Sequence, residues 1–380
     1  GLGDVYKRQI YKFRGANIYN ILNFENVFTG AKVIKLEQNY RSTQTILNAA
    51  NAVISNNIGR KSKSLWTDNG EGEKVNYTLY ENGYDEAEGV ASGIAEYVRD
   101  GWNYNDVAIL YRTNAQSRAL EEKLMIHNIP YKIYGGQNFY QRKEIKDILA
   151  YLKTIDNGLD GQAVKRIINV PKRGIGNTTI DRLQEYADFN DITFWEALVN
   201  AKDIDTIKNA ALSKLEPFVD LIGRLRAKEE FMSLKELAEA VIEDTGYIES
   251  LSQNETVEEV EARRENLDEF INKVVSYEES CKEAGEEPTL SGLLEEVALI
   301  ADIDNLDESE PHVMLMTLHS AKGLEFPIVY MTGMEDGLFP SYMTIVSDDS
   351  TEIEEERRLC YVGITRAEKI LNLTSAKSRM

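Results

Sequence analysis

The sequence predicts an α/β protein in which an all-helical segment interrupts a mostly parallel β-sheet. Up to about residue 138, short apolar runs typical of strands alternate with amphipathic helical patterns, and this alternation is typical of a parallel sheet. Strand patterns then disappear and return only at Val313. The chain has 380 residues, which is enough for two or three domains.

The first part of the chain predicts repeated strand and helix units. Residues 1–9 show no hydrophobic period, and we expect them to be partly foreign to the rest of the chain. Residues 31–37 predict a strand, followed by a polar tip at 38–41, a helix cap at Ser42 or Thr43 and an amphipathic helix. Further strands are expected at 75–80, 107–112 and 131–135, with helices at 86–99 and 115–127.

The middle of the chain predicts only helices. Apolar residues recur with helical spacing at 145–155, 163–170, 179–189, 193–200, 207–226, 234–245 and 257–279. An acidic linker at 302–310 precedes strands at Val313, Ile328 and 369–374. The simplest organisation is a helical domain, residues 139–304, inserted into an α/β domain.

Composition excludes several classes of protein. Hydrophobic residues make up 42% and charged residues 28%, and no apolar run is long enough to cross a bilayer. The two cysteines, Cys281 and Cys360, have no metal-ligand spacing and suit a reducing cytoplasm. The net charge of −21 argues against a nucleic-acid binder as a whole. However, the first 45 residues and residues 165–173 are net basic, so local nucleic-acid binding is compatible with the sequence.

One stretch combines strands with polar residues. In HVMLMTLHSAKGLEFPIVY, residues 312–330, two apolar runs flank a segment with His319, Ser320, Lys322, Gly323 and Glu325. Ligands of α/β sheets bind beyond the carboxyl ends of parallel strands, so this segment is a candidate site. An ordinary connection between strand and helix with a glycine turn explains the same stretch.

Four segments together resemble a known family. IYKFRGA, QNYRST, TLHSAKGLEF and EEERRLCYVGITRAEK are similar, in this order, to the later motifs of the UvrD/PcrA/Rep family of superfamily 1 DNA helicases. The resemblance implies a RecA-like motor domain interrupted by the helical domain. Residues 1–37 would end a first motor domain, and 38–138 and 305–380 would form the halves of a second, truncated one.

The same resemblance implies the activity and its partners. The parent protein would be an ATP-dependent 3′-to-5′ DNA helicase and translocase of replication and repair, located in the cytoplasm. ATP and Mg²⁺ would be its cofactors, and single-stranded DNA and junctions of single and double strands its substrates. Two alternatives remain open: a non-catalytic module that binds DNA or protein, and part of a helicase–nuclease subunit.

Four residues would form half of a nucleotide site by this resemblance. Arg41 and Arg366 match arginines that reach the γ-phosphate, where positive charge stabilises phosphoryl transfer. Arg366 is the better candidate for an arginine finger, and surface ion pairs are the alternative for both. Tyr40 matches an aromatic residue that stacks on the base, and Glu325 matches an acid that contacts the ribose.

Two further nucleotide-site positions lie near the start of the chain. Arg14 and Gln9 fall near family residues that sense the γ-phosphate. The family usually reads DQSIY where this chain reads RQIY, which puts the role of Gln9 in doubt.

The resemblance also assigns contacts with DNA. Tyr11 and Phe13, beside the basic Lys12, match aromatics on which single-stranded bases stack, although buried core aromatics are the alternative. His319 and Lys322 would face the phosphates of the same strand. His319 could equally be a structural histidine.

A separate turn in the helical segment predicts a phosphate cradle. In NVPKRGIGNTTI, Lys172 and Arg173 precede Gly174 and Gly176 at the start of a helix, and glycine N–H groups beside cations favour phosphate. The turn is similar to the one with which the family's inserted domain touches duplex DNA. A plain turn between helices is the alternative.

The motor motifs are incomplete. The sequence contains no G-x-x-x-x-G-K-[ST] phosphate loop and no acidic pair to hold Mg²⁺. We therefore expect a fragment that lacks the first motor domain of its parent, holds no Mg²⁺ ligands and does not hydrolyse ATP alone.

Overall fold

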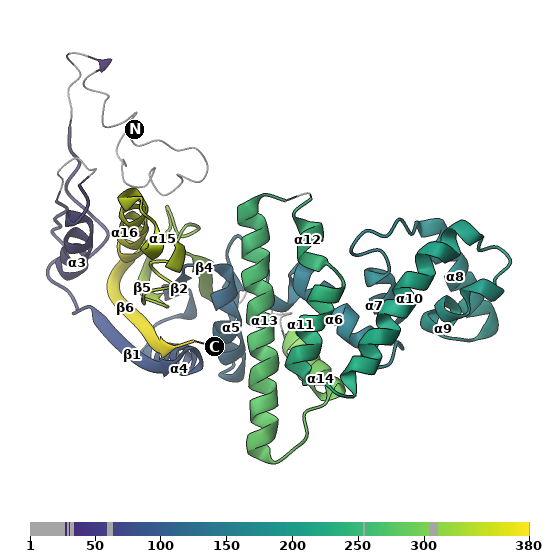
Figure 1. Ribbon diagram of the computed structural model, residues 1–380. Coiled ribbons are helices and arrows are strands. Elements are labelled where there is room, and N and C mark those ends of the chain that lie inside the picture. Colours follow the sequence, from purple (N-terminus) through teal and green to yellow (C-terminus); the bar gives the residue numbers. More distant parts are fainter. Residues whose placement is uncertain are drawn as a thin grey trace. The chain divides into compact units, whose positions relative to one another are not determined.

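The computed structural model describes residues 27–28, 30, 34–58, 64–253, 255–303 and 311–379. The chain divides into two compact units (Figure 1). Unit 1 comprises Gly1–Gln137 together with Leu306–Met380, and unit 2 comprises Asn138–Asn305.

Unit 1 is built on a six-stranded sheet within its described residues. The strands are β1 (Asn76–Asn82), β2 (Val107–Tyr111), β3 (Tyr131–Ile133), β4 (Val313–Thr317), β5 (Phe326–Met331) and β6 (Ala367–Ser378). Their order is β1-β6-β5-β2-β4-β3, and every neighbouring pair is parallel. Because β2 lies between β4 and β5, the two chain segments of unit 1 interleave in one sheet. The predicted α/β class with a parallel sheet is confirmed.

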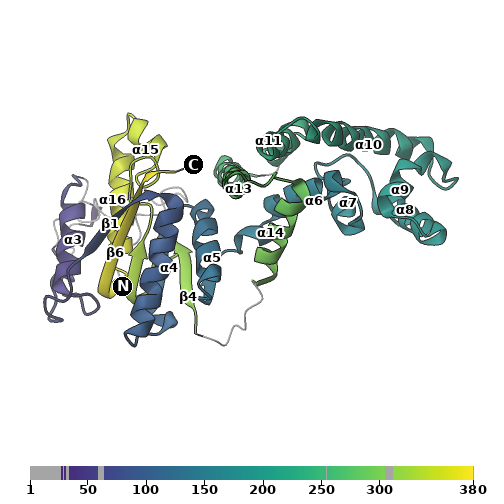
Figure 2. The ribbon, with the colours of Figure 1, turned by 90° about the horizontal axis from the view of Figure 1, so that it is seen from below.

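Helices cover both faces of the sheet. Among the described residues of unit 1, the helices are α3 (Gln44–Ser55), α4 (Gly83–Arg99), α5 (Ser117–Ile126), α15 (Tyr342–Val346) and α16 (Ser350–Ile364), with short 3-10 turns η2 (Tyr104–Asp106) and η3 (Asn114–Gln116). Side chains of a strand alternate between faces. Thus Val107, Ile109 and Tyr111 of β2 pack with α4 and α5, whereas Ala108 and Leu110 pack with α3 and α16. Figure 2 shows α4 and α5 on one side of the sheet and α3 and α16 on the other.

The predicted strand at residues 31–37 is wrong in its described part. Residues 34–37 form no strand, and the chain makes only an isolated parallel bridge between Gln38 and Trp66. Ile34 and Leu36 are 71% and 59% exposed, so the alternating apolar residues that suggested a strand have no sheet face to cover. Residues 31–33 lie outside the described part of the chain.

Unit 2 is helical throughout its described residues. Its helices are α6 (Lys143–Asp156), α7 (Gly161–Ile167), α8 (Asn177–Asn190), α9 (Phe194–Val199), α10 (Asn209–Glu229), α11 (Leu234–Asp244), α12 (Tyr247–Leu251), α13 (Val257–Ala284) and α14 (Leu290–Ile303), with 3-10 turns η4 (Phe139–Gln141) and η5 (Ala201–Asp203). The sequence patterns did not predict α12 and α14. α14 also continues to Ile303, which is inside the predicted acidic linker.

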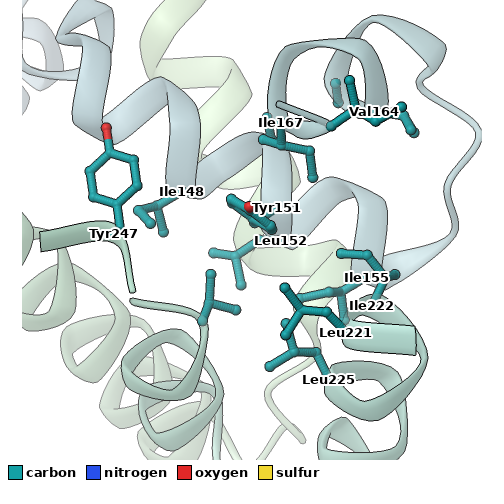
Figure 3. Close-up of a cluster of buried hydrophobic side chains, with 14 of the residues drawn as sticks. Ile148, Tyr151, Leu152, Ile155, Val164, Ile167, Leu221, Ile222, Leu225 and Tyr247 are labelled. Carbon is teal, nitrogen blue, oxygen red and sulfur yellow. The ribbon is translucent and has the colours of Figure 1, made fainter. Parts of the chain in front are cut away.

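The core of unit 2 brings distant helices together. Figure 3 shows one cluster, in which α6 meets α7 and α10 through apolar side chains: Ile148, Leu152, Ile155, Val164, Ile167, Leu221, Ile222 and Leu225. A buried polar contact supports it, since Asp147 accepts hydrogen bonds from Tyr247 Oη and Arg166 Nε, each at 2.7 Å. This core fixes α7, and therefore the turn that comes after it.

Candidate nucleotide and nucleic-acid sites

Two asparagine side chains hold the loop that contains Tyr40 and Arg41. The amides of Arg41 and Ser42 both donate to Asn39 Oδ1 at 2.8 Å. Asn69 Nδ2 lies within hydrogen-bond distance of three successive carbonyls, those of Tyr40 and Arg41 at 3.1 Å and that of Ser42 at 3.4 Å. The loop backbone is therefore fixed from two sides. The sequence did not single out Asn39 or Asn69, because neither carries a charge or an aromatic ring.

Arg41 forms an ion pair with Glu325. Arg41 Nε donates to Glu325 Oε2 at 2.5 Å, and Arg41 Nη1 donates to the carbonyl of Thr365 at 3.2 Å. The Arg41 side chain is 20% exposed and that of Glu325 is 53% exposed. Two residues that were predicted to bind different parts of a nucleotide thus contact each other directly.

Arg366 is buried, with an exposed fraction of 0%. Its Nε donates to the carbonyl of Val362 at 2.9 Å and its Nη1 to the carbonyl of Leu324 at 2.9 Å. Its Nη2 donates to Thr365 Oγ1 at 3.0 Å. In this conformation Arg366 joins the last turn of α16 to the segment before β5, and Arg41 is the more accessible of the two candidate arginines.

The ring of Tyr40 is exposed. It is 79% accessible, and its hydroxyl donates to Gln38 Oε1 at 2.9 Å. Gln38 Nε2 in turn donates to Asp68 Oδ2 at 2.8 Å. These bonds fix one edge of the ring and leave its faces available for stacking.

The predicted site residues are divided between the two ends of the sheet. Glu325 and Arg366 directly precede β5 and β6, and Arg41 contacts both segments, so these residues lie at the amino ends of the strands. The expected location beyond the carboxyl ends is wrong for Glu325. It is right for His319 and Lys322, which lie half-buried in the turns that come after β4. Sheet polarity therefore separates the nucleotide candidates from these nucleic-acid candidates.

Five predicted residues cannot be placed. Gln9, Tyr11, Lys12, Phe13 and Arg14 lie outside the described residues.

The turn after α7 surrounds the side chain of Arg173. Arg173 Nη2 donates to Tyr151 Oη at 2.6 Å, and the guanidinium carbon lies 5.0 Å from the centre of the Phe218 ring. Burial raises the pKa of the Tyr151 hydroxyl although Arg173 opposes the shift, so this acceptor is neutral at physiological pH. Arg173 Nη1 lies within hydrogen-bond distance of four backbone carbonyls, those of Ile167, Ile168, Val170 and Pro171, at 2.9, 3.4, 3.2 and 3.3 Å.

Three residues of the turn face outward, whereas Ile175 is buried. Lys172, Gly174 and Gly176 are exposed. Gly174 has a φ of +74°, a conformation that favours glycine, and Gly176 is the N-cap of α8 without a side-chain cap. Asn169 Oδ1 accepts from the amides of Arg173 and Ile175, at 2.8 and 3.2 Å. The turn is consequently held by hydrogen bonds on its inner side, while its outer side is accessible to solvent.

The part of the chain that the structure describes contains neither a membrane-spanning helix nor a cluster of metal ligands. None of its helices is long and apolar enough to cross a membrane. It also contains no group of three or more histidine, cysteine, aspartate or glutamate residues that could hold a metal ion.

The sequence of this chain matches a known protein family. The model of the UvrD-like helicase C-terminal domain matches residues 34–378. The chain is 50% identical over 373 residues to the ATP-dependent DNA helicase PcrA of Staphylococcus aureus (strain NCTC 8325 / PS 47), which covers 98% of this chain and 50% of the relative. It is 48% identical, with the same coverage, to PcrA of Staphylococcus epidermidis (strain ATCC 12228 / FDA PCI 1200).

The chain thus spans about half the length of the curated relatives it matches. The matched region contains Arg41, Glu325 and Arg366 and the turn at 169–176. This chain belongs to the family of UvrD-like helicase C-terminal domains.

Proposed function

We propose that this chain supplies one half of the ATP site, and part of the DNA-binding surface, of an ATP-dependent DNA helicase that moves 3′ to 5′ along DNA. The observation that carries the proposal is the meeting of Arg41, Glu325 and the Thr365–Arg366 segment at the amino ends of β5 and β6. These groups come from three distant parts of the sequence, and a structural role alone does not require an accessible arginine there.

The chemistry of this half-site suits a triphosphate. Transfer of a phosphoryl group is catalysed mainly by positive charge placed at the phosphate oxygens. Arg41 provides such a charge on a loop that Asn39 and Asn69 fix. Tyr40 offers an exposed ring for stacking on the base, and Glu325 offers carboxylate oxygens to the ribose hydroxyls. Arg366 would act as an arginine finger only if its side chain gave up the hydrogen bonds to the carbonyls of Val362 and Leu324 and bound the phosphate instead.

The remaining parts of the ATP site would come from elsewhere in the parent protein. Mg²⁺, when bound, would supply positive charge that offsets the charge of the phosphates. The described residues offer no set of carboxylates for it, so we assign none of them to the metal. We propose that a first motor domain of the same parent supplies the phosphate loop and the Mg²⁺ ligands. Residues 1–37 would then be the end of that domain.

The two units take different parts in this proposal. Unit 1 corresponds to the second motor domain, and its His319 and Lys322 contact single-stranded DNA beyond the carboxyl end of β4. Unit 2 corresponds to the inserted domain, and the turn at 169–176 contacts the duplex at a junction. The acidic net charge of −21 confines DNA binding to such local basic sites.

The first test compares ATP hydrolysis by this chain with that of a fusion to the N-terminal half of the Staphylococcus aureus relative. We expect DNA-stimulated hydrolysis only in the fusion. Arg41→Ala should lower kcat of the fusion by about three to five orders of magnitude, as the loss of an arginine finger does. Arg99→Ala, at an exposed arginine paired with Glu96, is the matched control and should leave kcat unchanged.

Two outcomes would contradict the proposal. Hydrolysis by the isolated chain that Arg41→Ala removes would mean that the site is complete without a second domain. A folded fusion without activity would instead favour a non-catalytic binding module.

A further inference from the structure

One of the two cations that the sequence places in the turn at 169–176, Arg173, is not directed to where a phosphate would bind. The Arg173 guanidinium is directed inward, against Tyr151 and the ring of Phe218. Its charge therefore stabilises the carbonyls of the turn instead of facing solvent. Only Lys172 of the predicted pair remains exposed.

A lysine from another helix lies at the same turn. Lys214 is an exposed residue of α10, and its Nζ donates to the carbonyl of Gly174 at 2.9 Å. A Cβ atom at Gly174 would lie 3.2 Å from Lys214 Nζ and 3.6 Å from its Cε, so the side chain runs along the bare face of the glycine. An ammonium group has three donors, and this contact uses one of them.

The charges around this turn are favourable for an anion. Neither Lys172 nor Lys214 forms an ion pair among the described residues. The first turn of α8 contains no acidic residue, and its N-cap Gly176 would meet nothing within 4 Å if it carried a Cβ. A second exposed ammonium group thus lies beside an accessible backbone, as phosphate binding requires.

We propose that Lys214 is a further nucleic-acid-binding residue, which contacts a phosphate of duplex DNA together with Lys172 and the glycine turn. The inference rests on the proposed role of unit 2 in duplex binding and adds α10 to that surface. The glycine at 174 serves it in two ways, since it adopts the positive φ and leaves room for the lysine stem. Lys214 then provides the charge that Arg173 directs inward.

The test measures duplex binding by the full chain as a function of salt. Binding to a fluorescein-labelled DNA hairpin is followed by anisotropy over a series of KCl concentrations. Each phosphate contact contributes about 0.9 to the slope of log K against log salt concentration. Lys214→Gln keeps a hydrogen-bond donor for Gly174 but removes the charge, so it should reduce the slope by about 0.9. Lys214→Arg should retain the slope.

The controls separate this inference from the proposed function. Lys172→Ala should also reduce the slope, whereas Lys235→Ala, at a lysine of α11 paired with Glu239, should not. A reduced slope for Lys172→Ala with an unchanged slope for Lys214→Gln would overturn the role of Lys214 alone. Unchanged slopes for both, or no duplex binding by the chain, would overturn both the inference and the duplex-binding role of the turn.

Discussion

The Arg173 guanidinium is bound by several groups of its own unit. It contacts backbone carbonyls, a phenol oxygen and an aromatic face, which together use the planar, multidentate geometry of arginine. Lysine has the same charge but a single donor nitrogen. Arginine at position 173 therefore contributes more to the structure of the turn than to the positive charge on the surface of the turn.

This difference leads to a prediction for Arg173→Lys. The substitution leaves several partly buried acceptors, carbonyls and Tyr151 Oη, without a donor. We therefore expect the free energy of unfolding of unit 2 to fall by about 1–3 kcal/mol. Chemical denaturation of the full chain, followed by circular dichroism, measures the change. Lys172→Ala replaces an exposed side chain, so its free energy of unfolding should stay within about 0.5 kcal/mol of that of the unsubstituted chain. Normal stability with weaker duplex binding would show instead that Arg173 contacts DNA.

At the scale of elements, the segment 64–74 supports the loop before α3. The amides of Gln44 and Thr45 donate to the carbonyls of Gly70 and Glu71 at 2.8 and 3.1 Å, so backbone groups take the place of a side-chain cap at the start of α3. Asn69 of the same segment bonds the carbonyls around Arg41. One segment thus positions both the helix and the candidate site.

We predict that Gly72→Ala disturbs this support. Gly72 has a φ of +74°, and a Cβ there would lie 2.3 Å from Thr43 Cγ2 and 2.4 Å from Thr43 Cβ. The unfavourable φ alone costs about 1–3 kcal/mol. Hydrogen exchange should therefore accelerate at the amides of Gln44 and Thr45. Gly101→Ala is the control, since its φ is also positive, at +99°, but a Cβ there would meet nothing within 4 Å. If Gly101→Ala accelerated hydrogen exchange at the amides of Gln44 and Thr45 as much as Gly72→Ala does, the contact with Thr43 would be excluded as the cause.

At the scale of the whole molecule, local patterns predicted more than distant pairings. The spacing of apolar residues, with a period of two in strands and of 3.6 in helices, predicted most of these elements. It could do so because the buried face of an element is determined by residues that are close in the sequence. The strand order and the partners of the site residues were not predictable in this way. Arg41 and Glu325 are 284 positions apart, and Lys214 and Gly174 are 40 apart. The resemblance predicted a role for Arg41 and for Glu325 separately, but it did not predict their ion pair.

The separate cores of the units give a prediction at this scale. Leu225 belongs to the core of unit 2 and Leu110 to a core of unit 1, and both are 0% exposed. Replacement of either by alanine should destabilise its own unit by about 2–5 kcal/mol. Hydrogen exchange resolved by peptide should show lost protection in unit 2 for Leu225→Ala and in unit 1 for Leu110→Ala. Equal loss in both units for either variant would show that the chain unfolds as one cooperative body.

The ion pair between Arg41 and Glu325 bears on which anions the proposed nucleotide half-site would bind. An anion that approaches Arg41 replaces or shares an existing carboxylate partner, so it gains only the difference between the two interactions. Chloride has one charge and no preferred direction, and it gains little by this exchange. A polyphosphate has several charges and several acceptor oxygens. In the proposed nucleotide half-site, the carboxylate would therefore favour a polyphosphate over chloride at Arg41.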